Sequence, residues 1–116
     1  MSMNKKSISI ELTPRFKKRL KQLAKRYRSI QKDIEPLITE LQTGKTPGNQ
    51  IQGLSYPVFK ARVKNSDTKT GKSGGYRVIY YIQSPTGILL LTIYSKSDQS
   101  DVSSPAIEDI IRQYQS

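Results

Sequence analysis

The chain has 116 residues, which is enough for one small domain with a single hydrophobic core. It carries 20 Lys and Arg against 9 Asp and Glu, and this net charge of +11 favours a polyanionic partner such as nucleic acid. The absence of cysteine and histidine excludes disulfides and thiolate metal sites and removes the commonest general base. We expect residues 1–116 to form one domain with no metal and no cofactor.

The sequence gives no sign of a membrane or export segment. The N-terminal residues are basic but lack the apolar core of a signal peptide. The longest apolar run, "ILLL" at residues 88–91, is far too short to span a membrane. We therefore expect a cytoplasmic protein without a membrane partner.

The chain opens with a predicted strand and a strongly basic helix. Residues 7–12 alternate apolar and polar side chains, as a half-buried strand does. Thr13 and Pro14 are a cap and first-turn pair for a helix over residues 14–28, whose apolar side chains recur at helical spacing. The other faces of this helix are crowded with Lys and Arg, although like charges one turn apart cost about 0.2–0.5 kcal/mol per pair. That crowding favours attraction to phosphates.

A second helix is predicted over residues 30–42, where Pro36 marks either a later start or a kink. Residues 43–57 are rich in glycine and proline and predict a loop. The elements that follow are strands at residues 58–64, 76–82 and 88–94 and a helix over 105–115 with Ser104 as its cap. The order β-α-α-β-β-β-α predicts an α+β fold, with an N-terminal helical hairpin packed on a mainly antiparallel sheet and a short C-terminal helix.

Three of the predicted strands carry cationic side chains. Lys60, Arg62 and Lys64 are two residues apart, so they project to one side of their strand, about 6.5–7 Å from one to the next. Arg77 lies near the start of the next strand, and a charge inside a sheet is costly unless it is paired or faces a ligand. Thr92, Tyr94 and Lys96 share a face of the last strand. If these faces coincide, one side of the sheet carries a cluster of Lys, Arg and Tyr.

Such a cluster suits RNA in two ways. Arg can hold two phosphate oxygens, and Tyr can stack on a base or relay a proton. Cleavage by the 2′-hydroxyl also needs a proton acceptor, and a Lys crowded by other cations can serve as one because its pKa falls. Surfaces of Lys, Arg and Tyr bind nucleic acid more often than they cleave it. The residues alone therefore favour binding and leave cleavage open.

The motifs "FKARVK", "GKSGGYRVIYY" and "LLLTIYSKSDQSD", at residues 59–64, 71–81 and 89–101, resemble the RelE/ParE superfamily of type II toxins, and most of all its HigB-like branch. The resemblance covers most of the chain. It implies a ribosome-dependent mRNA endonuclease that is held inactive by a co-expressed antitoxin. The antitoxins of such toxins are often helix-turn-helix proteins, and contact with operator DNA would run through the antitoxin.

The resemblance also implies functional residues. Those expected to be catalytic are Lys60, Arg62, Arg77 and Lys96, with Tyr94 in support. Those expected to bind RNA or the ribosome are Lys17, Lys18, Lys21, Lys25, Arg28, Lys64 and Lys72. Ser97 and Ser103 stand where RelE has an arginine and a tyrosine, so Tyr94 or Asp98 would have to substitute. The alternatives are a ParE-like toxin, which inhibits DNA gyrase and does not cut RNA, and a non-catalytic RNA-binding module.

Other residues of these motifs are expected to be structural. Tyr76, Val78, Tyr80 and Ile82 alternate with Arg77 along one strand and predict a core face. Asp98 and Asp101 precede the last helix, where a carboxylate commonly orders a turn. Gly74 and Gly75 either let the backbone approach RNA or form the turn into the strand.

Overall fold

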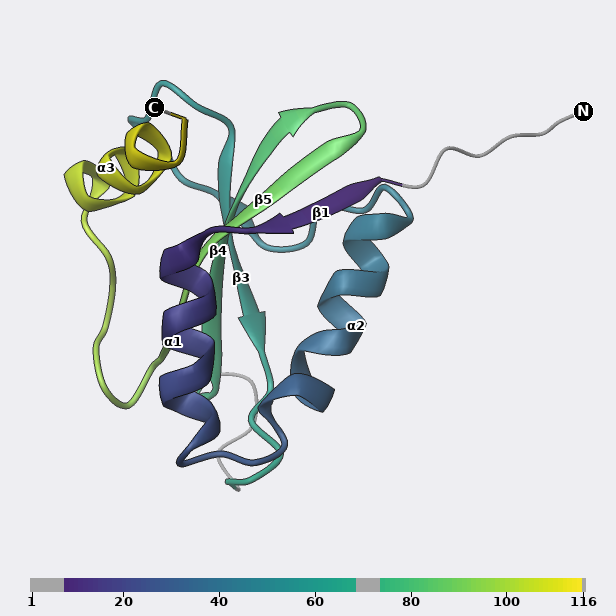
Figure 1. Cartoon of the computed structure of the whole chain (residues 1–116), viewed down its shortest axis with the longest axis vertical. Helices are drawn as coiled ribbons and strands as arrows, with labels where there is room; N and C mark the ends of the chain where they lie inside the picture. The colour runs from purple at the N-terminus through teal and green to yellow at the C-terminus, as the bar shows by residue number, and fades with distance from the viewer. Residues whose placement is uncertain (1–7, 69–73, 116) are drawn as a thin grey trace, which may run out of the picture.

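The computed structural model describes residues 8–68 and 74–115, and a five-stranded sheet with helices on both faces forms its centre (Figure 1). In chain order the elements are β1 (Ser9–Leu12), α1 (Pro14–Ala24), α2 (Ile30–Gln42), β2 (Asn49–Gln50), β3 (Val58–Val63), β4 (Tyr76–Ser84), β5 (Gly87–Ser95) and α3 (Ser104–Gln115). The strand order is β1-β5-β4-β3-β2, in which β1 runs parallel to β5 and every other neighbouring pair is antiparallel. The predicted α+β fold is confirmed, with β2 as an addition.

Thr13 joins the start of α1 to the sheet. Its hydroxyl accepts a hydrogen bond from the backbone N–H of Phe16 at 3.0 Å and donates one to the carbonyl of Leu91 at 2.8 Å. The predicted cap is therefore confirmed. The helix ends at Ala24 rather than at residue 28, because the carbonyl of Leu23 accepts from two successive N–H groups beyond the helix and tightens the chain into a turn.

The other two helices differ from expectation in detail. α2 runs through Pro36 without a later start, and its buried residues are Ile30, Ile34, Leu37 and Leu41. Pro36 itself is exposed, so the backbone carbonyl left without an N–H partner by the proline lies on the solvent side. In α3 the cap is Ser103 rather than Ser104, because the Ser103 hydroxyl accepts from the N–H of Ala106 at 3.3 Å.

The short strand β2 lies inside the segment that the sequence predicts as a loop. Asn49 pairs with Lys60 and Gln50 with Phe59. Gly48 precedes the strand with φ +93, and a Cβ atom at this position would lie 2.2 Å from the carbonyl oxygen of Lys60. Only a glycine fits so close to a neighbouring backbone. Two paired residues are too few to produce an alternating pattern, which is why the sequence did not reveal the strand.

Each face of the sheet carries its own apolar cluster. The face beneath α1 and α2 buries Tyr76, Val78 and Tyr80 completely, as predicted, and Ile82 partly. The opposite face is covered by α3, whose residues Ile107, Ile110 and Ile111 pack on a group that includes Val58, Ile79, Tyr81, Leu89 and Leu91. The closing helix therefore lies on one side of the sheet and α1 and α2 lie on the other (Figure 1). Arg77 shares the side of α3, because it alternates along β4 with residues that face α1 and α2.

Two buried tyrosines provide a test of this core. The hydroxyl of Tyr80 donates to the carbonyl of Pro47 at 2.6 Å, whereas in the described part of the chain the buried hydroxyl of Tyr76 has no hydrogen-bond partner. Tyr80→Phe is expected to lower the free energy of unfolding by about 1 kcal/mol, because the Pro47 carbonyl loses its donor. Tyr76→Phe is expected to cost nothing or to stabilise, because it removes an unsatisfied buried hydroxyl.

Urea denaturation of the two variants measures both values. They form a matched pair, since each removes one hydroxyl from a side chain that is fully buried. An equal loss of stability in both would contradict the described contacts.

Candidate functional site

The strand register places the predicted cations on one face of the sheet. Arg62 of β3 lies directly opposite Arg77 of β4, and Arg77 lies opposite Tyr94 of β5. Lys60 pairs with Ile79, one step along the same face. Because residues directly opposite one another in a sheet share a face, the three strands present these side chains to the same side.

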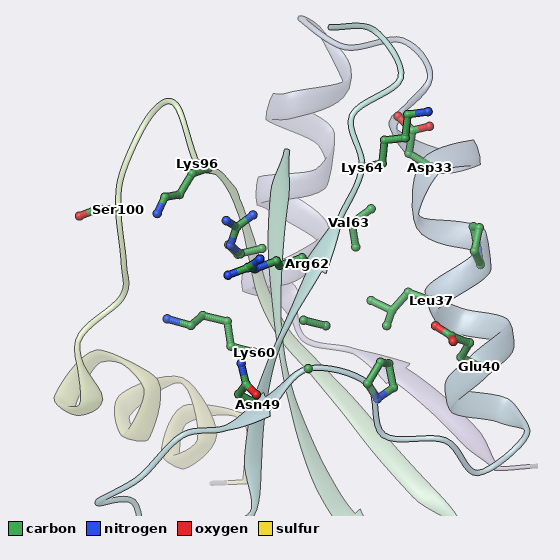
Figure 2. Close-up of a pocket in the computed structure, with 15 residues that line it drawn as sticks. Asp33, Leu37, Glu40, Asn49, Lys60, Arg62, Val63, Lys64, Lys96 and Ser100 are labelled. Carbon is green, nitrogen blue, oxygen red and sulfur yellow. The ribbon is translucent and has the colours of Figure 1, made fainter. Parts of the chain in front are cut away.

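These cations line a cleft of about 790 Å³ that runs around β3. Its basic residues are Lys60, Arg62, Lys64, Arg77 and Lys96. Figure 2 shows the side chains of Lys60, Arg62 and Lys96 extending to one side of β3, while Leu37 and Glu40 of α2 lie on the other side. The cleft is therefore strongly cationic at one end and carries acidic and apolar residues at the end next to α2.

Arg77 is the least exposed of these cations, at 7%. Its guanidinium donates to the neighbouring carbonyl of Tyr76 at 3.2 Å, and Arg62 lies directly across the ladder. Two like charges at opposite positions destabilise a sheet. An anion between or beside the two guanidinium groups would remove that cost, so the geometry suits a bound phosphate or carboxylate.

Gly75 brings this end of the sheet together. A Cβ atom at Gly75 would lie 2.2 Å from the carbonyl oxygen of Val63, and the Gly75 carbonyl accepts from the N–H of Lys96 at 2.9 Å. The ends of β3 and β5 thus meet at the start of β4. The close packing of the backbone therefore explains why a glycine occupies position 75, and it brings Arg77 and Lys96 near each other.

Lys60 is engaged within the protein. Its ammonium group donates to Asp101 at 3.1 Å, and the same carboxylate oxygen accepts from the N–H of Val102 at 2.8 Å. Burial alone would raise the pKa of Asp101, but the hydrogen bonds from Val102 and Lys60 outweigh it and hold that pKa below its usual value. The predicted role of Asp101 in ordering the turn before the last helix is confirmed.

Tyr94 does not line the cleft. It is 4% exposed, and its hydroxyl is buried without a hydrogen bond of normal geometry to any described residue. Burial, and then the nearby negative charge of Asp101, raise the pKa of this phenol. Its side chain instead lines smaller cavities beside α1. Tyr94 is therefore a neighbour of Arg77 on the same face of the sheet but lies outside the cleft that the cations line.

The basic residues expected to bind RNA fall into separate groups. Lys64 lines the cleft, and Lys72 lies outside the described residues. The remaining five, Lys17, Lys18, Lys21, Lys25 and Arg28, are exposed and do not line the cleft. None of these five forms a salt bridge within residues 8–68 and 74–115. They provide a second cationic surface on and just after α1.

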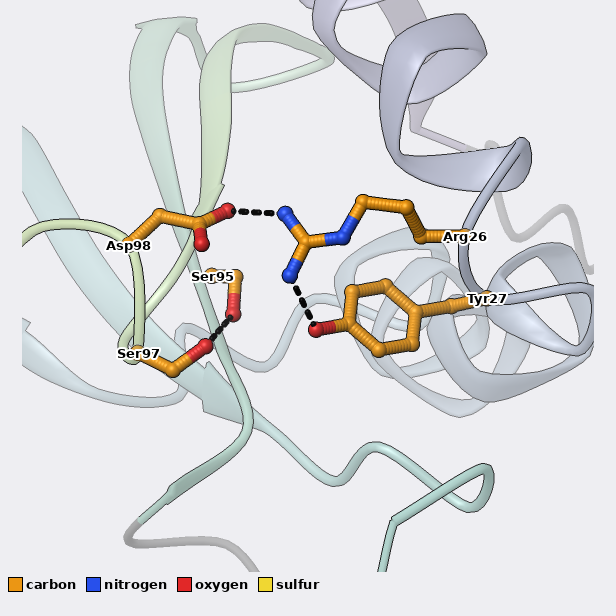
Figure 3. Close-up of polar contacts among 5 residues, drawn as sticks. All are labelled: Arg26, Tyr27, Ser95, Ser97 and Asp98. Atoms are coloured by element: carbon orange, nitrogen blue, oxygen red, sulfur yellow. Dashed lines mark hydrogen bonds and ion pairs between the residues drawn. The ribbon is translucent and has the colours of Figure 1, made fainter.

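A cluster that the sequence did not predict ties the turn after α1 to the segment after β5. Arg26 donates to Asp98 and to the hydroxyl of Tyr27, both at 2.8 Å, and the hydroxyls of Ser95 and Ser97 lie 2.9 Å apart (Figure 3). Arg26 and Asp98 are 72 residues apart, so no local pattern could reveal the pair. Asp98 is thus occupied by a salt bridge, and Ser97 is hydrogen-bonded beside it.

The described residues include no group of three or more metal-ligating side chains and no helix long and apolar enough to cross a membrane. The family described as "ParE toxin of type II toxin-antitoxin system, parDE" matches residues 10–100 of the chain. No curated protein matches it. Because the match covers most of the chain, the protein belongs to the ParE toxin family, and a cognate antitoxin is implied.

The Lys60–Asp101 ion pair can be tested by titration. Since the pKa of Asp101 is lowered in the folded state, its contribution to stability is present above the unfolded pKa and is lost as pH falls through the folded pKa. Lys60→Met is expected to raise the pKa of Asp101 toward the usual value of about 3.9, as followed by NMR of the carboxyl carbon. Lys64→Met is the control, because Lys64 forms no salt bridge to a described residue. An Asp101 pKa that does not respond to Lys60→Met would contradict the pair.

Proposed function

We propose that this member of the ParE toxin family acts by binding and inhibiting DNA gyrase, as the resemblance to the ParE branch implies, and does not cut RNA. The observation that carries the proposal is the family match over residues 10–100. That match names the ParE family and gives no support to the HigB-like branch. The ribosome and mRNA, which the sequence predicts as partners, therefore belong to the second candidate function described below.

The chemistry of the cleft also favours binding. RNA cleavage requires a group that takes a proton from the 2′-hydroxyl near neutral pH. The chain has no histidine, and the arginines of the cleft cannot be deprotonated in a protein. Lys60 is held by Asp101, and the raised pKa of the buried Tyr94 keeps that phenol protonated. The cleft thus offers several cations to hold an anion and leaves proton transfer to Lys64, Lys96, Asp33 or Glu40.

The charge of the toxin indicates how the antitoxin inhibits it. A protein of +11 with cations in the cleft and on α1 complements an acidic segment. We expect the antitoxin to lay such a segment over one of these surfaces. A helix-turn-helix domain in the antitoxin would then supply the contact with operator DNA, so the toxin would reach the operator only through its partner.

A second candidate function is ribosome-dependent mRNA cleavage. The observation that favours it is the direct pairing of Arg62 and Arg77 within the cleft. In this mechanism Arg77 would stabilise charge on the reacting phosphate. Arg62 would position the phosphate, and Lys60 and Lys96 would position it or transfer a proton. The cations of the α1 surface, together with Lys64 and Lys72, would contact ribosomal RNA.

Two assays on the purified toxin separate the candidates. We expect the toxin to inhibit supercoiling of relaxed plasmid DNA by gyrase and to leave mRNA on translating ribosomes intact, as read by primer extension. Cleavage of ribosome-bound mRNA with gyrase unaffected would reverse the order of the two candidates. RNA binding without either effect would point to a plain RNA-binding module.

Arg77 distinguishes binding from catalysis. If the toxin cleaves mRNA, Arg77→Ala should slow single-turnover cleavage by about 10²–10³-fold with little change in ribosome affinity. Arg77→Lys is the sharper variant, because it keeps the charge and loses the two-pronged grip on phosphate. Reversing Lys17, Lys21 and Arg28 to Glu is the contrasting variant, which should lower affinity and its salt slope and spare the cleavage rate. Wild-type cleavage by both Arg77 variants would make Arg77 a binding or structural residue.

A further inference from the structure

A second cavity, of about 250 Å³, lies between the start of α1, the end of β5 and the beginning of α3. Its wall includes Arg15 and Arg19 of α1, Thr92 and Tyr94 of β5, and Asp101. None of its lining residues also lines the cationic cleft. The cavity is therefore a separate site, which neither candidate function uses.

The two arginines carry an uncompensated charge. Arg15 and Arg19 are one helical turn apart, so their side chains share one side of α1. Arg26, further along, is neutralised by Asp98, whereas Arg15 and Arg19 form no salt bridge with any described residue. The first turn of α1 contains no acidic residue, which leaves Arg15 at the positive end of the helix dipole. Arg15 is therefore repelled by Arg19 and by the positive end of the helix dipole, and an anion in the cavity would offset both effects.

Hydrogen-bond donors lie in the same wall. The buried hydroxyl of Tyr94 lies beside the Asp101 carboxylate but has no hydrogen bond of normal geometry to a described residue, so it can turn to donate to a ligand oxygen. A buried hydroxyl without a partner costs free energy, and a ligand oxygen would remove that cost. The twelve-residue helix α3 also begins here, since Ser103 and Ala106 line the cavity, and its positive dipole end adds to the attraction for an anion.

Asp101 is the one acidic residue of this wall. Its carboxylate is already held by the ammonium group of Lys60 and the N–H of Val102, on the side of the cationic cleft. The negative charge of Asp101 is therefore compensated from outside the cavity. The wall keeps a net positive charge from Arg15 and Arg19.

We propose that this cavity binds a single phosphate group, either free or carried by a mononucleotide, which Arg15 and Arg19 grip and to which the Tyr94 hydroxyl donates. A guanidinium group matches the geometry of phosphate oxygens, and two of them on one side of a helix can bind the same group. The volume of about 250 Å³ suits a small ligand and is too small for a polynucleotide strand. The inference does not depend on whether the toxin acts on gyrase or on ribosomes.

The test is a calorimetric titration of the purified full chain with inorganic phosphate and, separately, with adenosine 5′-monophosphate at constant ionic strength. Arg15→Gln/Arg19→Gln is expected to weaken binding by about 10–100-fold, the scale of a lost charge-assisted contact. Lys17→Gln/Lys21→Gln is the matched control, because it removes the same charge at the same spacing from exposed positions outside the cavity. It should change the affinity by less than about twofold, since exposed charges are screened by salt.

Tyr94→Phe gives a second, independent readout. It keeps the ring and removes only the hydroxyl, so the fold should survive and phosphate affinity should fall by about 3–10-fold. Equal affinity for the two probes would identify the phosphate group alone as the ligand, and tighter binding of the nucleotide would identify a nucleotide site. The proposal is overturned if neither probe binds, or if the Lys17→Gln/Lys21→Gln variant loses as much affinity as the Arg15→Gln/Arg19→Gln variant. It is also overturned if Arg62→Gln abolishes binding while the Arg15→Gln/Arg19→Gln variant still binds.

Discussion

Burial of β4 on both faces is the constraint on which the rest of the structure depends. Tyr76, Val78 and Tyr80 are fully buried beneath α1 and α2, and Ile79 and Tyr81 pack with α3 on the other face. Placing a charge in such a strand is costly unless the charge meets a partner or a ligand. Arg77 is the one charged residue of β4, and it lies near the start of the strand, where the cleft opens. The cationic cleft therefore lies at the end of β4 where Arg77 is no longer covered by the packed helices.

The shortage of acidic residues decides how the surface is organised. The chain has 9 acidic residues for 20 basic ones, and the described residues form three salt bridges, each at a particular place. Asp98 binds Arg26 and Asp101 binds Lys60, so the segment between β5 and α3 is tied to the turn after α1 on one side and to β3 on the other. The second of these pairs lies between the large cleft and the smaller cavity. The same few carboxylates thus fix the segment and keep two cationic sites apart.

Local patterns of sequence predicted the elements well and their three-dimensional relations poorly. Alternation revealed β1 and β3, strand-like runs on either side of a turn revealed β4 and β5, and Thr13 with Pro14 marked the start of α1. The register that aligns Arg62, Arg77 and Tyr94 could only be assumed, because strand pairing depends on long-range contacts that local patterns do not reveal. The face covered by α3 could not be predicted either. The tyrosines of β4 are buried, so most residues of the motif "GGYRVIYY" serve to pack the core. The motif therefore identified the superfamily but could not distinguish its RelE, HigB and ParE branches.

The distinction between binding and cleavage therefore depends on a few residues outside the core. In both proposed functions the cations of the cleft would hold an anion, and Arg62, Arg77 and Lys96 are the residues placed to do so. Only cleavage also needs a proton acceptor and a proton donor within reach of the substrate. Ser97 stands where RelE has an arginine, and its hydroxyl lies 2.9 Å from that of Ser95. Tyr94, the nearest phenol on the same face, lies opposite Arg77 but lines the smaller cavity instead. Under the proposed inhibition of gyrase, the cations of the cleft need only bind an acidic group, whereas cleavage would also require one of its lysines or carboxylates to move a proton.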